Sequence, residues 1–113
     1  MKKILILMAL LPLSTWASNW SGNVQVTELI GGYKGGFFLF KTTGTHHNPN
    51  GSCETSYYSV DPESADADKA YALVLAALKS GSDIKVGVDP TGCGRSGVQH
   101  LTNKIKVTRV SSN

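Results

Sequence analysis

The sequence has few charged residues and no cluster of one charge sign. Charged side chains make up 17% of its 113 residues, with eleven lysines and arginines, eight aspartates and glutamates, and a net charge of +3. Neither a polybasic tail nor an acidic tail is present. Nucleic-acid-binding domains gather their basic side chains on one face, so we expect no nucleic acid among the partners of this chain.

Long apolar segments are also missing. The apolar run near the N-terminus covers residues 4–13, and a membrane-spanning helix needs about 20. Two lysines precede this run, and Thr15 and Ala17 stand at the −3 and −1 positions of a cleavage site. This layout is typical of a signal peptide; a retained N-terminal anchor is the alternative. We predict that residues 1–17 are removed and that the mature chain begins at Ser18, without a membrane span.

Cysteine is scarce, and no CxxC pair occurs. Cys53 and Cys93 are the two cysteines of residues 18–113, a length of 96 residues that fits a single domain. Their placement relative to the histidines does not match a zinc site. An even number of cysteines in a small exported domain predicts a disulfide. We therefore expect a bridge between Cys53 and Cys93 and a secreted or periplasmic location.

Apolar side chains recur at strand spacing in five segments. Val24 and Val26 alternate with polar residues, and Leu29 breaks the alternation before Ile30. The short apolar run of residues 37–40 has the length of a strand that is buried on both faces. Turns rich in glycine and asparagine separate the segments. The predicted strands cover residues 24–30, 37–40, 53–60, 84–89 and 104–108.

One helix is expected, over residues 67–80. Either Asp61, followed by Pro62, or Asp66 supplies its N-terminal cap, and Gly81 is a natural stop. The resulting order, β-β-β-α-β-β, is mostly β with one helix and is the order of the OB-fold, a five-stranded barrel. A five-stranded sheet with a helix across one face is the competing arrangement.

The expected helix is apolar on nearly all sides, because residues 70–78 form an unbroken apolar run. Leu73, Val74, Ala77 and Leu78 are expected to face the strands. A helix this apolar is typically buried all round, but one small domain covers only one of its faces. We therefore expect a homo-oligomer, with an interface formed by Ala72, Leu75 and Ala76.

Several segments together resemble a known family. They are the start Asn19-Trp20-Ser21-Gly22, the central Cys53, the helix end Leu78-Lys79-Ser80-Gly81, and the strand Ile84-Lys85-Val86-Gly87-Val88 that leads to Cys93. This layout is similar to the B subunits of AB5 toxins, notably those of subtilase cytotoxin and typhoid toxin. The resemblance implies an OB-fold, a ring-shaped homopentamer with helices lining its pore, and binding to cell-surface glycans. No individual sugar-binding residue is carried over from the family.

The candidate ligand-binding residues follow from the expected fold. OB-folds bind ligands on the face of strands two and three, between the first and fourth inter-strand loops. Tyr57 and Tyr58 place one aromatic on each face of the third strand, and we take Tyr58 as the ligand-facing one. Arg95 lies in the expected glycine-rich loop of residues 90–97 and is suited to bind a carboxylate. The candidate contacts are Tyr33, Lys34, Tyr58 and Arg95.

Catalytic and metal-binding signals are weak. His46 and His47 stand in a loop without an acidic or cysteine ligand at useful spacing. Ser96, His100 and Asp89 form only a nominal triad, because no nucleophile elbow surrounds the serine. We expect no metal, no cofactor and no enzyme activity. The sequence thus predicts an exported, non-catalytic, glycan-binding homo-oligomer. The alternative is a periplasmic or secreted inhibitor or accessory protein that binds another protein.

Overall fold

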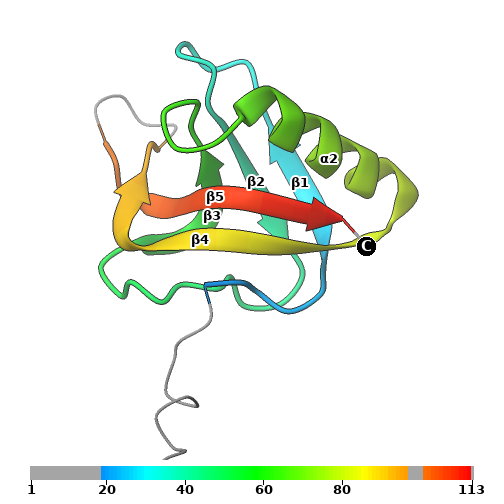
Figure 1. Ribbon diagram of the computed structural model, residues 1–113, viewed down its shortest axis with the longest axis horizontal. Helices are drawn as coiled ribbons and strands as arrows, with labels where there is room; N and C mark the ends of the chain where they lie inside the picture. Colours follow the sequence, from blue (N-terminus) through cyan, green and yellow to red (C-terminus); the bar gives the residue numbers. More distant parts are fainter. Residues whose placement is uncertain (1–18, 97–100, 113) are drawn as a thin grey trace, which may run out of the picture.

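A computed structural model describes residues 19–96 and 101–112 of the chain. Within those residues, five strands and one helix follow one another in the predicted order β-β-β-α-β-β (Figure 1). The elements are β1 (Val24–Ile30), β2 (Phe38–Thr42), β3 (Glu54–Val60), α2 (Ala67–Ser80), β4 (Asp83–Gly94) and β5 (Lys104–Ser112).

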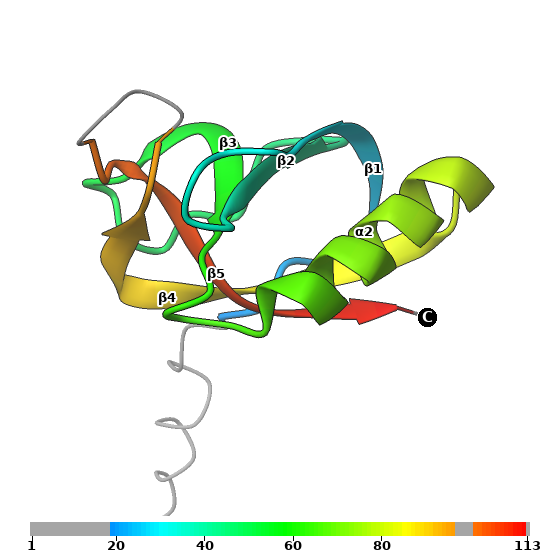
Figure 2. The same ribbon diagram turned by 90° about the horizontal axis from the view of Figure 1, so that it is seen from above.

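The five strands close into a barrel in the order β1-β2-β3-β5-β4. β3 and β5 run parallel, and the other four neighbouring pairs are antiparallel. The ring is completed where β1 meets β4, with Val24 opposite Ile84. This is the OB-fold-like barrel that the sequence predicts, and it excludes the competing five-stranded sheet with a helix across one face. Figure 2 shows α2 lying beside the barrel.

Side chains from alternate strand positions fill the interior of the barrel. Phe40 and Tyr58 are fully buried, and their ring centroids are 5.2 Å apart. Residues 37–40 are all buried, which confirms that this short run is covered on both faces. The core is completed mainly by Val60, Val74, Ile84, Val86, Val88, Ile105 and Val107.

A β-bulge in β1 explains why Leu29 breaks the alternation. The register between β1 and β2 shifts between Val26 and Glu28, so two steps along β1 oppose one step along β2. Beyond the bulge, Leu29 packs against the core. Glu28 takes the opposite phase and reaches the outer face of the barrel, where its carboxylate meets Tyr57.

Helix α2 is capped at both ends by its own sequence. The Asp66 side chain accepts a hydrogen bond from the backbone N–H of Lys69 at 3.2 Å, so Asp66 rather than Asp61 is the N-terminal cap. The helix ends at Gly81, whose φ of 72° lies in the left-handed region that glycine tolerates best.

The buried stripe of α2 is narrower than expected. The helix contacts β1, β4 and β5, and its buried residues are Ala67, Ala70, Val74 and Ala77. Leu73 was expected to face the strands, but it is 37% exposed. The small alanines set the buried stripe and leave Leu73 on its flank, so this assignment was wrong. Ala72, Leu75 and Ala76 are exposed.

β4 is longer than the sequence predicts, because it continues through Pro90 instead of ending in a loop there. Its register with β5 shifts between Val88 and Cys93, and this irregular stretch accommodates a proline that cannot donate a ladder hydrogen bond. Cys93, near the end of β4, forms the predicted disulfide with Cys53, with 5.6 Å between the Cα atoms. The bridge ties the end of β4 to the start of β3.

Candidate binding site

The two adjacent tyrosines of β3 point to opposite sides of the barrel, and their assignment from sequence was reversed. Tyr58 is fully buried, and its hydroxyl accepts a hydrogen bond from the backbone N–H of His47 at 2.7 Å. The ring of His46 lies 4.6 Å from the Tyr58 ring. Tyr58 is therefore a core residue that holds the 43–53 loop, and Tyr57 is the tyrosine on the outer face.

Tyr57 is surrounded by polar groups from neighbouring strands. Its hydroxyl donates to Glu28 Oε2 at 3.1 Å. The amines of Lys41 and Lys104 lie 4.9 and 5.9 Å from the centre of its ring. Desolvation, together with the Glu28 carboxylate, raises the pKa of the Tyr57 hydroxyl. A row of one acid, two amines and an aromatic ring thus runs across β1, β2, β3 and β5.

Lys104 is held in this row by Glu54. Its Nζ donates to Glu54 Oε1 and, at 3.0 Å, to Ser56 Oγ. The hydrogen bond from Lys104, followed by that from Ser56, lowers the pKa of the Glu54 carboxyl to about 2. Within the described residues Lys41 forms no ion pair. Lys41 is therefore the cation of the row that is available to a ligand.

A second set of contacts borders the row on the side of the 31–37 loop. The rings of Tyr33 and Phe37 stack with 4.6 Å between centroids and 7° between planes. The Arg95 guanidinium lies 5.2 Å from the centre of the Phe37 ring. Arg95 Nε also donates to Asp61 Oδ2 at 2.6 Å. Tyr33 and Arg95, both predicted from sequence, are thus brought together, and Phe37 is the residue between them that the sequence reading missed.

Arg95 is bonded within the protein's own structure, while its side chain remains 34% exposed and lines a pocket of about 330 Å³ with Asp61 and Lys106. Its guanidinium makes a second bond to Asp61, whose side chain is only 9% exposed. A Cβ added to Gly35 would come within 2.5 Å of Arg95 Nη1, and Gly35 has a φ of +96°. Glycine is therefore required where the loop crosses the guanidinium. The carboxylate that Arg95 was expected to bind is supplied by Asp61 of the same chain.

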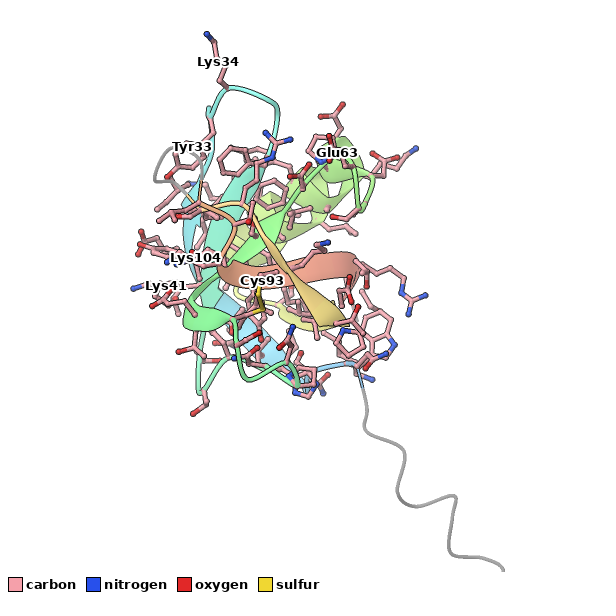
Figure 3. All side chains as sticks on the ribbon, turned by 90° about the vertical axis from the view of Figure 1, so that its left-hand side faces the viewer. Tyr33, Lys34, Lys41, Glu63, Cys93 and Lys104 are labelled. Atoms are coloured by element: carbon pink, nitrogen blue, oxygen red, sulfur yellow. A yellow bond between two sulfur atoms is a disulfide. The ribbon has the colours of Figure 1, made fainter. Side chains whose placement is uncertain are left out.

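Figure 3 shows Tyr33, Lys104 and Lys41 along one side of the molecule, and Lys34 at the tip of its loop pointing away from them. The four candidates from sequence therefore have different positions. Tyr33 borders the outer face, Arg95 fixes the loop that carries it, Lys34 projects into solvent and Tyr58 lies in the core. We define the outer-face site as Glu28, Lys41, Tyr57 and Lys104, bordered by Tyr33.

His46 and Asp89 have structural partners within the chain. The Nε2 of His46 accepts from the Thr42 N–H at 3.1 Å and its Nδ1 lies 2.7 Å from the Thr55 carbonyl oxygen, so both ring nitrogens are used. Asp89 accepts from the backbone and hydroxyl of Thr91, and His100 lies outside the described residues. Across residues 19–96 and 101–112, no three histidine, cysteine, aspartate or glutamate side chains gather as a metal site. In the same part of the chain, no helix is long and apolar enough to cross a membrane.

No protein-family model matches the sequence. No curated protein and no solved structure matches it either. Function is therefore inferred from the residues of the site itself, because one fold hosts many functions.

Proposed function

We propose that this chain is an exported, non-catalytic binding module that recognises glycans through the outer-face site and assembles into a homo-oligomer through α2, in the manner of a toxin B subunit. The observation that carries the proposal is Tyr57, a partly buried aromatic ring on the outer face that is set among Glu28, Lys41 and Lys104.

The chemistry of this site suits a sugar ring. A pyranose has apolar C–H faces that pack on an aromatic ring and hydroxyls that both donate and accept hydrogen bonds. Tyr57 supplies an apolar body with a polar tip, Glu28 accepts from hydroxyls, and Lys41 donates to them. A few polar groups placed around an aromatic surface fix the orientation of a small ligand. Two of the four strands that carry the site, β2 and β3, form the ligand-binding face of OB-folds.

The exposed surface of α2 supports the homo-oligomer. Leu75 is 37% exposed, and Ala72 and Ala76 lie beside it on the same solvent-facing side of α2. Burying one leucine contributes about 1.5–3 kcal/mol relative to exposure. Alanines between the larger side chains let two helices approach closely. A ring of copies would present several weak sugar sites at once, and linked sites bind far more tightly than single ones.

A glycan array probed with the mature protein, residues 18–113, tests the proposed class of ligand. Saturable binding to a defined set of glycans supports it. Absence of binding to any glycan, together with capture of one stoichiometric protein partner, would replace it with the inhibitor or accessory role.

A further inference from the structure

A small pocket lies between the 31–37 loop and the first two turns of α2, on the helix side of the Tyr33–Phe37 stack. Its volume is about 140 Å³, comparable to an engineered cavity of about 150 Å³ that admits benzene. The outer-face site and the Arg95–Asp61 pair do not line it. Its lining consists of Gly31, Gly32, Tyr33, Gly36, Phe37, Phe38, Ala67, Asp68 and Tyr71.

The walls of this pocket are aromatic. Tyr71 meets Phe38 edge to face, with 5.2 Å between centroids and 89° between planes. Tyr33 is stacked on Phe37. Phe37 and Phe38 are buried, whereas Tyr33 and Tyr71 are partly exposed, so the tyrosines form the accessible walls above a phenylalanine base.

Glycine backbone keeps the loop side of the pocket open. A Cβ on Gly31 would come within 3.0 Å of the Tyr71 ring, so the loop backbone approaches that ring closely. Gly32 has a φ of +91°, and an added Cβ there would meet nothing within 4 Å. The loop therefore contributes backbone and open space, and the aromatic rings are left to contact a ligand.

The charge of the lining is negative. Asp68 is its one carboxylate, and neither lysine nor arginine is among the lining residues. In the described residues no cation pairs with Asp68. Asp68 stands in the first turn of α2, where its full negative charge outweighs the partial positive charge of about +0.5 at the helix N-terminus. A cation is therefore favoured over an anion or a neutral ring.

From these observations we infer that the pocket binds an organic cation, specifically a quaternary ammonium group. Aromatic faces attract such cations through their ring quadrupoles, and an aromatic cage is the known means of holding them. The bulky methyl groups pack on Tyr33 and Tyr71, and Asp68 supplies the counter-charge. Glu28, Lys41, Tyr57 and Lys104 of the outer-face site do not line this pocket, although Tyr33 borders both sites, and the test does not depend on glycan binding.

The probes are choline chloride and its neutral carbon analogue 3,3-dimethylbutan-1-ol, added to the mature protein at constant ionic strength. Backbone amide shifts in the NMR spectrum report binding. Choline is expected to produce saturable shifts at residues 31–37 and 67–71, while the neutral analogue produces none at the same concentrations. Equal binding of the two probes, or no saturable shift with choline, would overturn the proposal.

Two variants and two controls locate the site. Asp68→Asn preserves shape and removes the charge, and Tyr71→Ala removes a wall; each should weaken choline binding about tenfold. Leu73→Ala removes a side chain of equal exposure on the other flank of α2, and Lys69→Ala removes an exposed charge next to Asp68. Both controls should bind choline as the wild type does. Tyr71 packs on Phe38, so Tyr71→Ala could fail to fold. In that case the test of the pocket rests on Asp68→Asn alone. An Asp68→Asn protein that binds choline as tightly as the wild type would refute the cage.

A quaternary ammonium group occurs both on soluble molecules and on lipid headgroups. Sedimentation with phosphatidylcholine vesicles separates these sources once choline binding is established. If the wild type binds the vesicles and Asp68→Asn does not, the ligand is the headgroup of a lipid. Binding to free choline without vesicle binding assigns a soluble cation, and either result supports the pocket.

Discussion

Asp61 and Arg95 are joined by two hydrogen bonds, from Nε to Oδ2 at 2.6 Å and from Nη2 to Oδ1 at 3.3 Å. Asp61 follows β3, and Arg95 follows β4, so the pair joins two chain segments that are 34 residues apart. The guanidinium also lies over Phe37, on which Tyr33 stacks. The position of Tyr33 at the border of the outer-face site thus depends on a charge pair between two distant chain segments.

Replacing Arg95 is expected to loosen the 31–37 loop and lower stability. Arg95→Ala leaves the nearly buried Asp61 carboxylate without its two bonds, which should cost about 2 kcal/mol. Arg95→Lys should lose most of the same free energy, since a lysine cannot make two parallel bonds. Urea unfolding measures both. Lys69→Ala, which breaks an exposed ion pair with Asp66, is the control and should stay within about 0.5 kcal/mol of the wild type. An Arg95→Ala protein as stable as this control would contradict the role given to the pair.

The disulfide should account for a large part of the stability of the domain. It joins cysteines 40 residues apart, and closing a loop of that length stabilises by about 4 kcal/mol on the chain-entropy estimate. The double variant Cys53→Ser with Cys93→Ser should lose roughly this amount in urea unfolding at neutral pH. Wild-type protein whose disulfide has been reduced should lose a similar free energy of unfolding. Unchanged stability in both would mean that the bridge contributes nothing to folding.

The Glu54–Lys104 pair predicts a pH dependence with a defined sign. The pKa of Glu54 falls from 4.5 to about 2 in the folded protein, so the folded state holds this proton less tightly than the unfolded state does. The Glu54–Lys104 pair therefore stabilises the folded protein above pH 4.5, and this stabilisation is lost as the pH falls towards 2. Because the Glu54 side chain is 46% exposed, screening limits it to less than about 1 kcal/mol.

Unfolding free energies of the wild type and of Glu54→Gln, measured from pH 6 down to about pH 2.5, test this sign. The two proteins should differ most at the upper end of the range and converge at the lower end. A difference that grows as the pH falls would show that the pair destabilises the charged form.

Leu75 provides the test of self-association through α2. The mature protein should run as an oligomer, a pentamer if the toxin-like ring is right, and Leu75→Lys should yield a folded monomer. A lysine at the interface replaces a contact worth about 1.5–3 kcal/mol in each subunit by an unpaired charge. Light scattering coupled to size exclusion gives the mass, and circular dichroism confirms folding. Leu101→Lys, at a residue that is 44% exposed and outside α2, should leave the oligomer intact. A wild-type monomer at micromolar concentration would refute the ring.

The order of elements could be predicted because local signals mark it. Glycine-rich turns, alternation in the strands and Gly81 after the helix are all visible in the chain. Strand ends were less predictable. Pro90 indicated a loop, yet long-range pairing with β5 carries β4 past it. Leu29 breaks the alternation of apolar residues in the sequence, and only the bulge between Val26 and Glu28 explains why it faces the core.

The site was harder to read from sequence, since it depends on contacts between distant segments. Tyr57 and Tyr58 are adjacent aromatics, and the surrounding serine and threonine give no clear alternation to separate inside from outside. Phe37 looked like a core residue, and its contact with Arg95 joins segments 58 residues apart, as counted in the sequence. Alternation could not identify Glu28 or Lys41, because Glu28 is in the phase of Val24 and Val26 until the bulge turns it outward, and Lys41 follows an unbroken apolar run. Their meeting at Tyr57 required the register of three strands.

The most direct measurement compares Tyr57 and Tyr58 on a glycan array alongside the wild-type protein. Tyr57→Ala should lose most glycan binding with little change in melting temperature, since it removes the aromatic platform from the surface. Tyr58→Phe should keep the binding but melt at a lower temperature, since it removes the buried acceptor of the His47 N–H at a cost of about 1–3 kcal/mol. The two substitutions should therefore have opposite effects, one on glycan binding and the other on melting temperature. A Tyr57→Ala protein that binds the same glycans as strongly as the wild type would contradict it.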